Sequence, residues 1–395
     1  MSTSQHTRRA IHYALEGAAV LLLVALATLI AILHVTRPEI RYSTQAALSE
    51  TTVQAQVRQV NVEETTVDET GLIMVYQELE LEVRSQGDYR GRILTLPFNG
   101  MGPTLDAVRF REGQRALVMI SQRHDGQTFF QVTDHVRLGP LALIVGVFVA
   151  LILGIGRGKG VRAIVGLVLS ALLIGGFIMP QILAHRDPTL VSLAGTALLL
   201  AVTLYLIQGW NPTGHAALLG MLAALAVTGG LAIVWTRLAY LTGFGAEETL
   251  FLQAVGVGIE MRGLLLAGMI IGAAGVLDDV VLAQAVTVFE LAAANADLSR
   301  RELYRRSMKI GVTHLASMIN TLVLAYASAA LPLLLLFYLY PEPWYLTINR
   351  ELIAEEIVRT LVGSTGLMTA VPLTCAIAAW AATTTLAKVS EPSQG

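Results

Sequence analysis

The chain has 395 residues, of which 54% are hydrophobic and 14% are charged, and its formal net charge is −2. Soluble globular proteins carry about 25% charged residues, and segments that face lipid produce such a shortfall because a charge in hydrocarbon costs kilocalories. The net charge argues against a nucleic-acid partner, since that binding needs a basic surface. The single cysteine, Cys375, lies in an apolar run. It cannot form an internal disulfide, and we expect a small core residue.

The first apolar run, about residues 17–33, follows Arg8 and Arg9. A helix needs roughly 20 residues to span a bilayer, whereas the apolar part of a cleaved signal needs only about 7–15. No small-residue cleavage site follows before Thr36 and Arg37. We therefore expect residues 1–37 to form a cytoplasmic N-terminus and an uncleaved signal-anchor helix.

Residues 38–137 are more polar, and their periodicity changes to two. Residues 53–58 and 78–83 alternate apolar and polar side chains, as half-buried strands do. Asp125-Gly126, between the apolar runs 117–120 and 129–132, predicts a hairpin turn. We expect four or five strands in an extracytoplasmic β-rich domain, either a barrel or a sandwich, with an OB-like barrel among the options.

Two histidines and two aspartates in this region suggest a metal site at first sight: His124, Asp125, Asp134 and His135. The first two lie in the expected turn and the last two precede the next apolar run. We therefore interpret all four as solvated polar positions.

Seven further apolar runs are long enough to cross a bilayer. They cover residues 138–155, 163–183, 190–207, 216–235, 263–281, 312–338 and 358–386. With the first run, they predict an α-helical integral membrane protein of about eight transmembrane helices. We expect residues 138–388 to form its seven-helix transmembrane domain and residues 389–395 a cytoplasmic tail. Glycines such as Gly195, Gly268 and Gly272 suggest close helix packing.

Basic residues in the short loops set the orientation. They occur at Arg8, at residues 157–162 and 300–309, and at Lys388, all on one side of an eight-span topology, while the opposite loops carry glutamates. Because positive loops remain cytoplasmic, we expect both termini in the cytoplasm and residues 38–137 outside it.

Ionisable and polar residues interrupt the sixth and seventh runs. Asp279 and Glu290 share one helical face, and Asp278 points about 100° away. At 1.5 Å per residue, Asp279 and His314 lie at similar depths near the cytoplasmic boundary, so we expect the two side chains to interact and Asp279 to be buried. Beside His314, the seventh run carries a polar stripe: Thr313, Ser317, Asn320 and Thr321.

This arrangement has two interpretations. A carboxylate–imidazole pair beside hydroxyls and an amide can relay protons or ligate a divalent cation. Alternatively, the polar residues form an internal clamp between two helices. An enzyme is not expected, because the sequence has no His-Glu-x-x-His, phosphate-binding loop or Gly-x-Ser-x-Gly motif, and no cofactor is implied.

Several motifs of this region resemble the YibE/F family of bacterial membrane proteins. They are Gly263-Leu-Leu-Leu-Ala-Gly268, Gly272-Ala-Ala-Gly-Val-Leu-Asp-Asp279, Phe289-Glu-Leu291, Ser299-Arg-Arg-Glu-Leu-Tyr304, Asn320-Thr-Leu-Val-Leu-Ala-Tyr326 and Leu331-Pro-Leu-Leu-Leu335, with Gly209–Ala217 as a short hairpin. The resemblance implies a multi-pass protein of the bacterial cytoplasmic membrane with a transport role. Family members usually continue Ile-Gly with Arg-Asp, whereas this chain has Val312-Thr313 after Gly311.

We therefore hypothesise a transporter or permease of an ion or small solute, with a polar site between the sixth and seventh helices. The candidate site residues are Asp279, His314, Asn320, Asp278, Glu290, Ser317 and Thr321, and no metal is specified. The alternative is a non-transporting membrane module whose outer β domain binds an envelope partner. The expected partners are the lipid bilayer and a small solute or ion, together with an envelope protein or a second copy of the chain.

Overall fold

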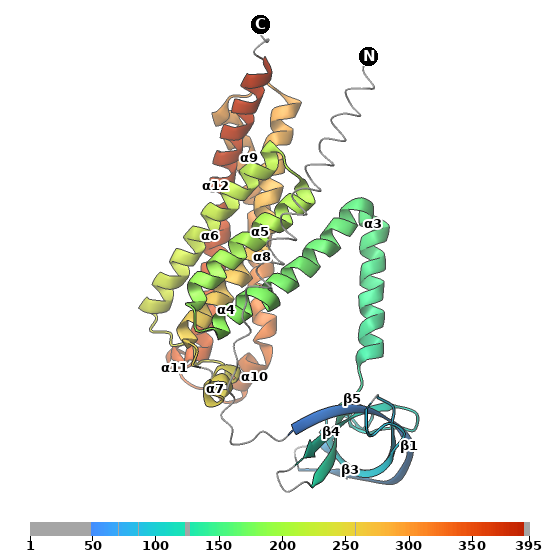
Figure 1. The fold of residues 1–395 in the computed structure, drawn as a ribbon. Helices are drawn as coiled ribbons and strands as arrows, with labels where there is room; N and C mark the ends of the chain where they lie inside the picture. Colours follow the sequence, from blue (N-terminus) through green and yellow to red (C-terminus); the bar gives the residue numbers. More distant parts are fainter. Residues whose placement is uncertain (1–48, 70, 86, 123–126, 257, 391–395) are drawn as a thin grey trace, which may run out of the picture. The chain divides into compact units, whose positions relative to one another are not determined.

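The computed structural model describes residues 49–69, 71–85, 87–122, 127–256 and 258–390. It divides into two compact units, which are described separately (Figure 1). The β unit lies within Arg41–Leu151, and the helical unit contains the described residues from Ile152 onward. The predicted first span, residues 17–33, lies outside the described residues.

The β unit is a single five-stranded antiparallel sheet with strand order β3-β2-β1-β4-β5. The strands are β1 (Ser49–Val67), β2 (Ile73–Val83), β3 (Ile93–Gly102), β4 (Arg115–Gln122) and β5 (Thr128–His135), and the short helix α2 (Leu105–Val108) follows β3. The long β1 pairs with β4 through its first half and with β2 through the rest, with register shifts at Val57/Gln59 and Val60/Val62. Such bulges bend a strand. The two edge strands β3 and β5 contact each other, so the sheet is nearly closed.

The predicted alternation is confirmed. Ala55 and Val57 on β1 and Leu79 and Leu81 on β2 are fully buried, while the glutamates between the β2 positions are partly exposed. Strands β4 and β5 flank the predicted hairpin turn and pair antiparallel. The turn residues themselves, including His124 and Asp125, lie outside the described residues.

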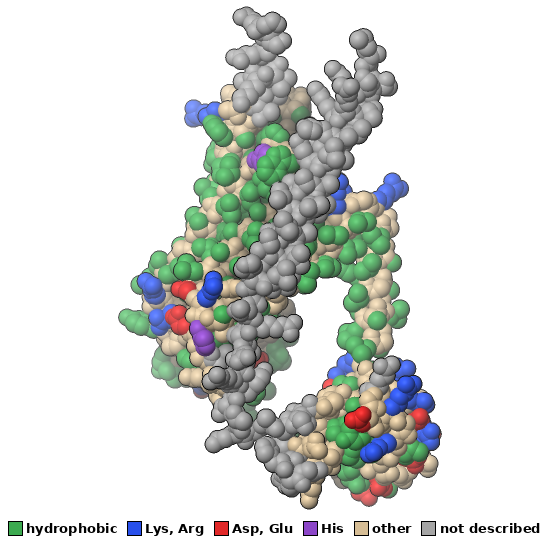
Figure 2. Space-filling view, in the orientation of Figure 1, with side chains coloured by type: hydrophobic (Ala, Val, Ile, Leu, Met, Phe, Trp, Pro, Cys, Tyr) green, Lys and Arg blue, Asp and Glu red, His purple; other side chains and the backbone are tan. Residues whose placement is uncertain are grey.

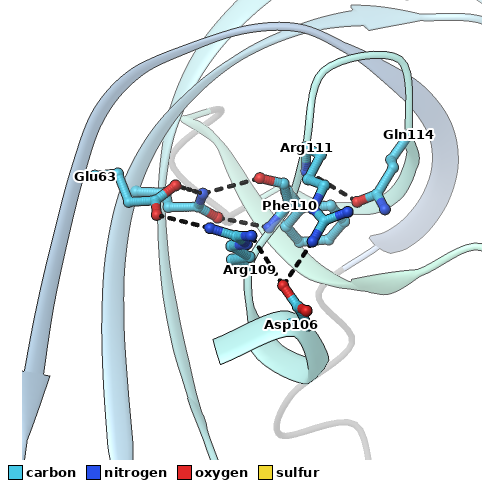
Figure 3. Close-up of polar contacts among 7 residues, drawn as sticks. Glu63, Asp106, Arg109, Phe110, Arg111 and Gln114 are labelled. Atoms are coloured by element: carbon cyan, nitrogen blue, oxygen red, sulfur yellow. Dashed lines mark hydrogen bonds and ion pairs between the residues drawn. The ribbon is translucent and has the colours of Figure 1, made fainter. Parts of the chain in front are cut away.

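One buried polar side chain of β2 links the connection between β3 and β4 to the sheet through hydrogen bonds (Figure 3). This side chain is the amide of Gln77, which is fully buried. Its oxygen accepts a hydrogen bond from the Phe110 backbone N–H at 2.7 Å. Its nitrogen donates to the Phe110 carbonyl at 2.9 Å and to the Glu63 carboxylate at 2.8 Å. Buried polar groups need such partners. Arg109 and Arg111 both pair with Asp106, so α2 is tied to the same connection.

The helical unit contains most of the predicted spans. Its elements are α3 (Leu138–Leu173, which begins in the β unit), η1 (Ile174–Ile178), α4 (Met179–Leu183), α5 (Pro188–Gln208), α6 (Pro212–Leu238), α7 (Glu247–Ala254), α8 (Met261–Ala294), α9 (Arg300–Ala329), α10 (Leu331–Leu339), α11 (Trp344–Asn349) and α12 (Glu351–Ser390). Among the described residues, six helices are long and apolar enough to cross a membrane.

The first of these six, Leu138–Leu183, has 46 residues and a non-helical backbone at Arg157, with φ 47° and ψ −125°. The predicted runs 138–155 and 163–183 lie on either side of that break. The run 312–338 divides into α9 and α10 at Ala330, just before Pro332, because proline removes a helical hydrogen bond. The total of eight spans stays a prediction.

Helix α8 packs against α5, α6, α9 and α12, and α6 and α12 also pack together. Figure 1 shows these helices side by side, and Figure 2 shows hydrophobic side chains over the middle of the helical unit with charged ones toward its ends. The predicted close packing holds at Gly195, where a Cβ would lie 2.6 Å from Ile178. At Gly268 no atom of the described residues lies within 4 Å of a Cβ, so close packing is not seen there in the described part of the chain.

Candidate functional site

The predicted polar stripe of α9 lies on the exposed side of that helix. His314, Ser317, Asn320 and Thr321 are all exposed. The α9 residues that pack against α8 and α12 are others: Tyr304, Met308, Leu315, Met318 and Ile319. The Thr321 hydroxyl donates to the Ser317 carbonyl one turn earlier, at 3.1 Å. The stripe therefore satisfies part of its polar groups within its own helix.

The carboxylates of α8 do not meet this stripe. Asp279 and Glu290 are exposed, and Asp278 is half-buried. Among the described residues, no hydrogen bond or ion pair joins Asp279 to His314. We expected Asp279 to be buried, and this expectation is wrong because the side chain is exposed. The fully buried Leu277 faces the bundle interior. Asp279 lies about 200° around the helix from Leu277, so it faces away from that interior.

The polar residues that do meet inside the bundle are others. Gln284 of α8 is 2% exposed, and its amide oxygen accepts a hydrogen bond from the Cys375 thiol of α12 at 3.5 Å. A Cβ on Gly311 of α9 would lie 2.9 Å from that same oxygen. Ser307, also on α9, is buried and donates to the Tyr304 carbonyl at 3.0 Å. Three helices therefore approach closely around one buried amide, which we call the Gln284 cluster.

Buried hydroxyls without partners form a second feature of the interior. Five of them lie in α5, α6 and α12, and none has a hydrogen-bond partner among the described residues: Ser192, Thr196, Thr236, Ser364 and Thr374. Hydroxyls in membrane helices usually bond to their own backbone or across to another helix. An unpartnered buried polar group is unusual and indicates a strained or functional position.

A third polar feature lies where α12 begins. The Glu351 carboxylate accepts hydrogen bonds from the Thr242 backbone, from the Thr242 hydroxyl at 2.8 Å and from the Gly243 backbone at 2.9 Å. One turn later, Glu355 is 4% exposed and accepts the Gly245 backbone N–H at 3.2 Å. Both glutamates precede the predicted span 358–386. In the structure they lie in the first turns of a helix and hold the connection between α6 and α7.

No group of three or more His, Cys, Asp or Glu residues is placed to hold a metal within the part of the chain that the structure describes. In the β unit, Asp134 pairs with Arg137 at 2.6 Å, and hydrogen bonding to that guanidinium lowers the pKa of the carboxyl. The His135 ring lies 3.9 Å from the Phe110 ring between centroids, and burial lowers the pKa of the imidazole. Both residues have structural partners.

Sequence reasoning missed the Gln284 cluster and the unpartnered hydroxyls. One signal was present, a glutamine inside the apolar segment Val281–Val286. The hydroxyls gave none, because serine and threonine are tolerated throughout membrane helices. Cys375 is confirmed as a small core residue, since it is fully buried.

Comparison with known proteins gave one match. A sequence model of the family described as YibE/F-like protein matches residues 144–384. No curated protein matches the chain, and no solved structure matches it.

Proposed function

Because the chain belongs to the YibE/F-like family and six of its described helices are long and apolar enough to cross a membrane, we propose that its helical unit lets a small polar solute or ion cross the bilayer. The observation that carries this proposal is the set of buried, unpartnered hydroxyls in α5, α6 and α12. A hydroxyl kept in the bundle interior without a partner costs about 1–3 kcal/mol. A passing solute with hydrogen-bonding groups would recover that energy.

The side chains of α8 support the same proposal. Gln284 and Asp278 lie in the mostly apolar helix α8, and polar side chains in such segments commonly line a pathway. The Gln284 amide is 2% exposed and so places a polar group inside the bundle. We therefore propose the bundle interior as the pathway, in place of the exposed stripe of α9.

The test is flux into liposomes that contain the purified full chain. Proton entry is followed with an internal pH dye and divalent-cation entry with a Mn²⁺-quenched dye. Thr236→Val and Thr196→Val remove a buried hydroxyl while nearly preserving shape. Each is expected to slow flux about tenfold, which corresponds to one hydrogen bond to the solute.

The matched control is Thr321→Val, because that threonine is exposed and bonds only to its own helix. It should transport like the wild type. Equal flux in the wild-type chain and in empty liposomes would contradict transport of both probes. Equal flux in all variants would contradict the proposed pathway.

A second function, binding of an envelope partner by the β unit, is favoured by a different observation. Met74 and Met101 are paired neighbours on β2 and β3, both are exposed, and the exposed Tyr76 lies two residues along β2. Exposed apolar groups that cluster in this way are typical of interaction sites. The strand order, with α2 between β3 and β4, also supports an OB-like barrel, a fold often used for binding.

A photo-reactive residue in place of Tyr76 tests this function in intact cells. A single predominant crosslinked envelope protein would support it, provided that the same residue in place of Thr95, which is also exposed on β3, gives none. Equal crosslinking at both positions would contradict it.

A further inference from the structure

A pocket of about 570 Å³ lies beside the start of α12, between α10 and the connection that follows α6. Its walls are mostly apolar and aromatic: Phe244, Leu333, Leu336, Phe337, Tyr340 and Leu352. Three charged side chains also line it. The Glu351 carboxylate is already bonded to Thr242 and Gly243, while Glu342 and Arg350 form the charged edge of the pocket. Neither the pocket nor these charges belong to the pathway proposed above.

The pocket has a fixed wall. Phe244 and Gly245 belong to the connection that Glu351 and Glu355 hold through backbone and hydroxyl hydrogen bonds. The Phe244 backbone N–H also lies 3.4 Å from the Thr242 hydroxyl that Glu351 binds. The aromatic wall therefore stands in place before any ligand arrives, which reduces the entropy cost of binding.

The charged edge presents both signs close together. Two guanidinium nitrogens of Arg350 contact the two carboxylate oxygens of Glu342, at 2.5 and 3.2 Å. The Arg350 guanidinium carbon also lies 5.4 Å from the centre of the Phe337 ring, which forms part of the pocket wall. The two side chains are still 52% and 33% exposed. Each charge therefore retains room for a further partner of opposite sign.

The surroundings indicate a membrane boundary. Tyr340, Trp344 and Tyr345 are exposed at 70%, 74% and 53%, and amphipathic rings of this kind favour the level of the lipid headgroups. A molecule that reaches this pocket would come from the headgroup layer with an apolar chain attached.

From this geometry we propose that the pocket binds phosphatidylethanolamine. Part of an acyl chain lies against Leu333, Leu336 and Phe337. The phosphate oxygens accept hydrogen bonds from Arg350, as the planar guanidinium suits phosphate. The headgroup ammonium donates to Glu342. A zwitterionic headgroup thus places one charge on each member of the ion pair, whereas phosphatidylglycerol has no cation for Glu342 and phosphatidylcholine has no N–H to donate.

Native mass spectrometry of the delipidated full chain in detergent tests this proposal. Phosphatidylethanolamine, phosphatidylcholine, phosphatidylglycerol and diacylglycerol are offered at equal concentration. The ethanolamine lipid should bind about tenfold more tightly than each of the others, the effect expected of one charge-assisted hydrogen bond. Equal binding of all four lipids, or preference for phosphatidylglycerol, would overturn the proposal.

Variants locate the site. Arg350→Gln and Glu342→Gln change partly exposed side chains, so the fold should persist, and each should remove the preference for phosphatidylethanolamine. Leu336→Trp fills the pocket and should reduce binding of every lipid, while Leu334→Trp, on the same helix but outside the pocket lining, should not. Unchanged lipid preference in both charge variants would contradict the proposed role of the ion pair.

Discussion

Gly366 of α12 lies so close to Thr228 of α6 that a Cβ on the glycine would stand 2.1 Å from the threonine hydroxyl oxygen. Eight residues away on each helix, the relationship is exchanged: a Cβ on Gly220 of α6 would stand 2.6 Å from the hydroxyl oxygen of Thr374 on α12. The two helices therefore meet through two reciprocal glycine–threonine contacts. Small residues at such positions let helix backbones approach each other in lipid.

Gly366→Ala is expected to destabilise the helical unit by about 1–3 kcal/mol, the usual cost of overpacking. Thr228 is buried and β-branched, so it cannot turn away easily. Thermal unfolding of the purified chain measures the effect. Gly268→Ala is the control, because no atom of the described residues lies within 4 Å of a Cβ there and alanine favours a helix over glycine. The double change Gly366→Ala with Thr228→Ala should recover part of the loss, and no recovery would show that the clash lies elsewhere.

In the β unit, Gln77→Leu should destabilise the connection that carries Phe110. The change removes both hydrogen bonds to the Phe110 backbone, and each buried group left unpaired costs about 1–3 kcal/mol. Hydrogen exchange at the Phe110 amide should accelerate strongly. Gln59→Leu, at an exposed position on β1, should leave that exchange unchanged. Protection of Phe110 that survives Gln77→Leu would refute the assigned role.

The β unit should lose stability in acid in two separate ranges. The folded pKa of His135 is lowered below its ordinary 6.5 by burial, so the unfolded state binds the proton first and stability falls as the pH drops through about 6.5. The folded pKa of Asp134 is lowered below 3.8 by Arg137. Its contribution is present above 3.8 and is lost as the pH falls through the lowered value.

Hydrogen exchange of β4 and β5 between pH 7 and pH 5 isolates the first range. After correction for the intrinsic pH dependence of amide exchange, the exchange rates give the free energy of unfolding of the β unit. In His135→Gln this free energy should be nearly independent of pH between pH 7 and pH 5. His185→Gln, outside the β unit, should behave like the wild type. An undiminished pH dependence in His135→Gln would assign the effect to another group.

The orientation can be tested with single cysteines, since Cys375 is buried and should not react in the wild-type chain. With both termini cytoplasmic, Asp88→Cys in the β unit should react with an impermeant thiol reagent in intact cells. Ala296→Cys, between α8 and α9, should react only after the membrane is opened. The reverse pattern would overturn the predicted topology.

The features that the sequence predicted are those set by local chemistry. Apolar runs predicted the long helices because lipid requires a continuous apolar surface, and alternation predicted buried Ala55, Leu79 and Leu81 because strands expose alternate faces. The short helices α7 and α11 escaped prediction because they have only 8 and 6 residues and no apolar period.

The candidate site could not be predicted in the same way, because it depends on how neighbouring helices face one another, and the sequence of one helix does not contain that information. Helical spacing shows that Thr313, Ser317 and Asn320 share a face, but it does not show which neighbour that face meets. The predicted depths in the membrane suggested that Asp279 lies beside His314. Which face of each helix points inward, however, is decided by packing, here by buried residues such as Leu277 and Leu303. The partners of Gln284 come from α9 and α12, up to 91 residues away.

The two adjacent aspartates of α8 provide the last prediction. Asp278 is half-buried and Asp279 is exposed, so the bundle interior constrains the first more than the second. If solutes pass through that interior, Asp278→Asn should slow proton or Mn²⁺ flux in liposomes, because the amide keeps the shape and removes the charge. Asp279→Asn is the matched control and should change flux little. A larger loss of flux in Asp279→Asn than in Asp278→Asn would contradict the proposed interior pathway. It would favour a transport site on the exposed face that carries Asp279 and His314. That face would then need a partner, such as a second copy of the chain, to cover it.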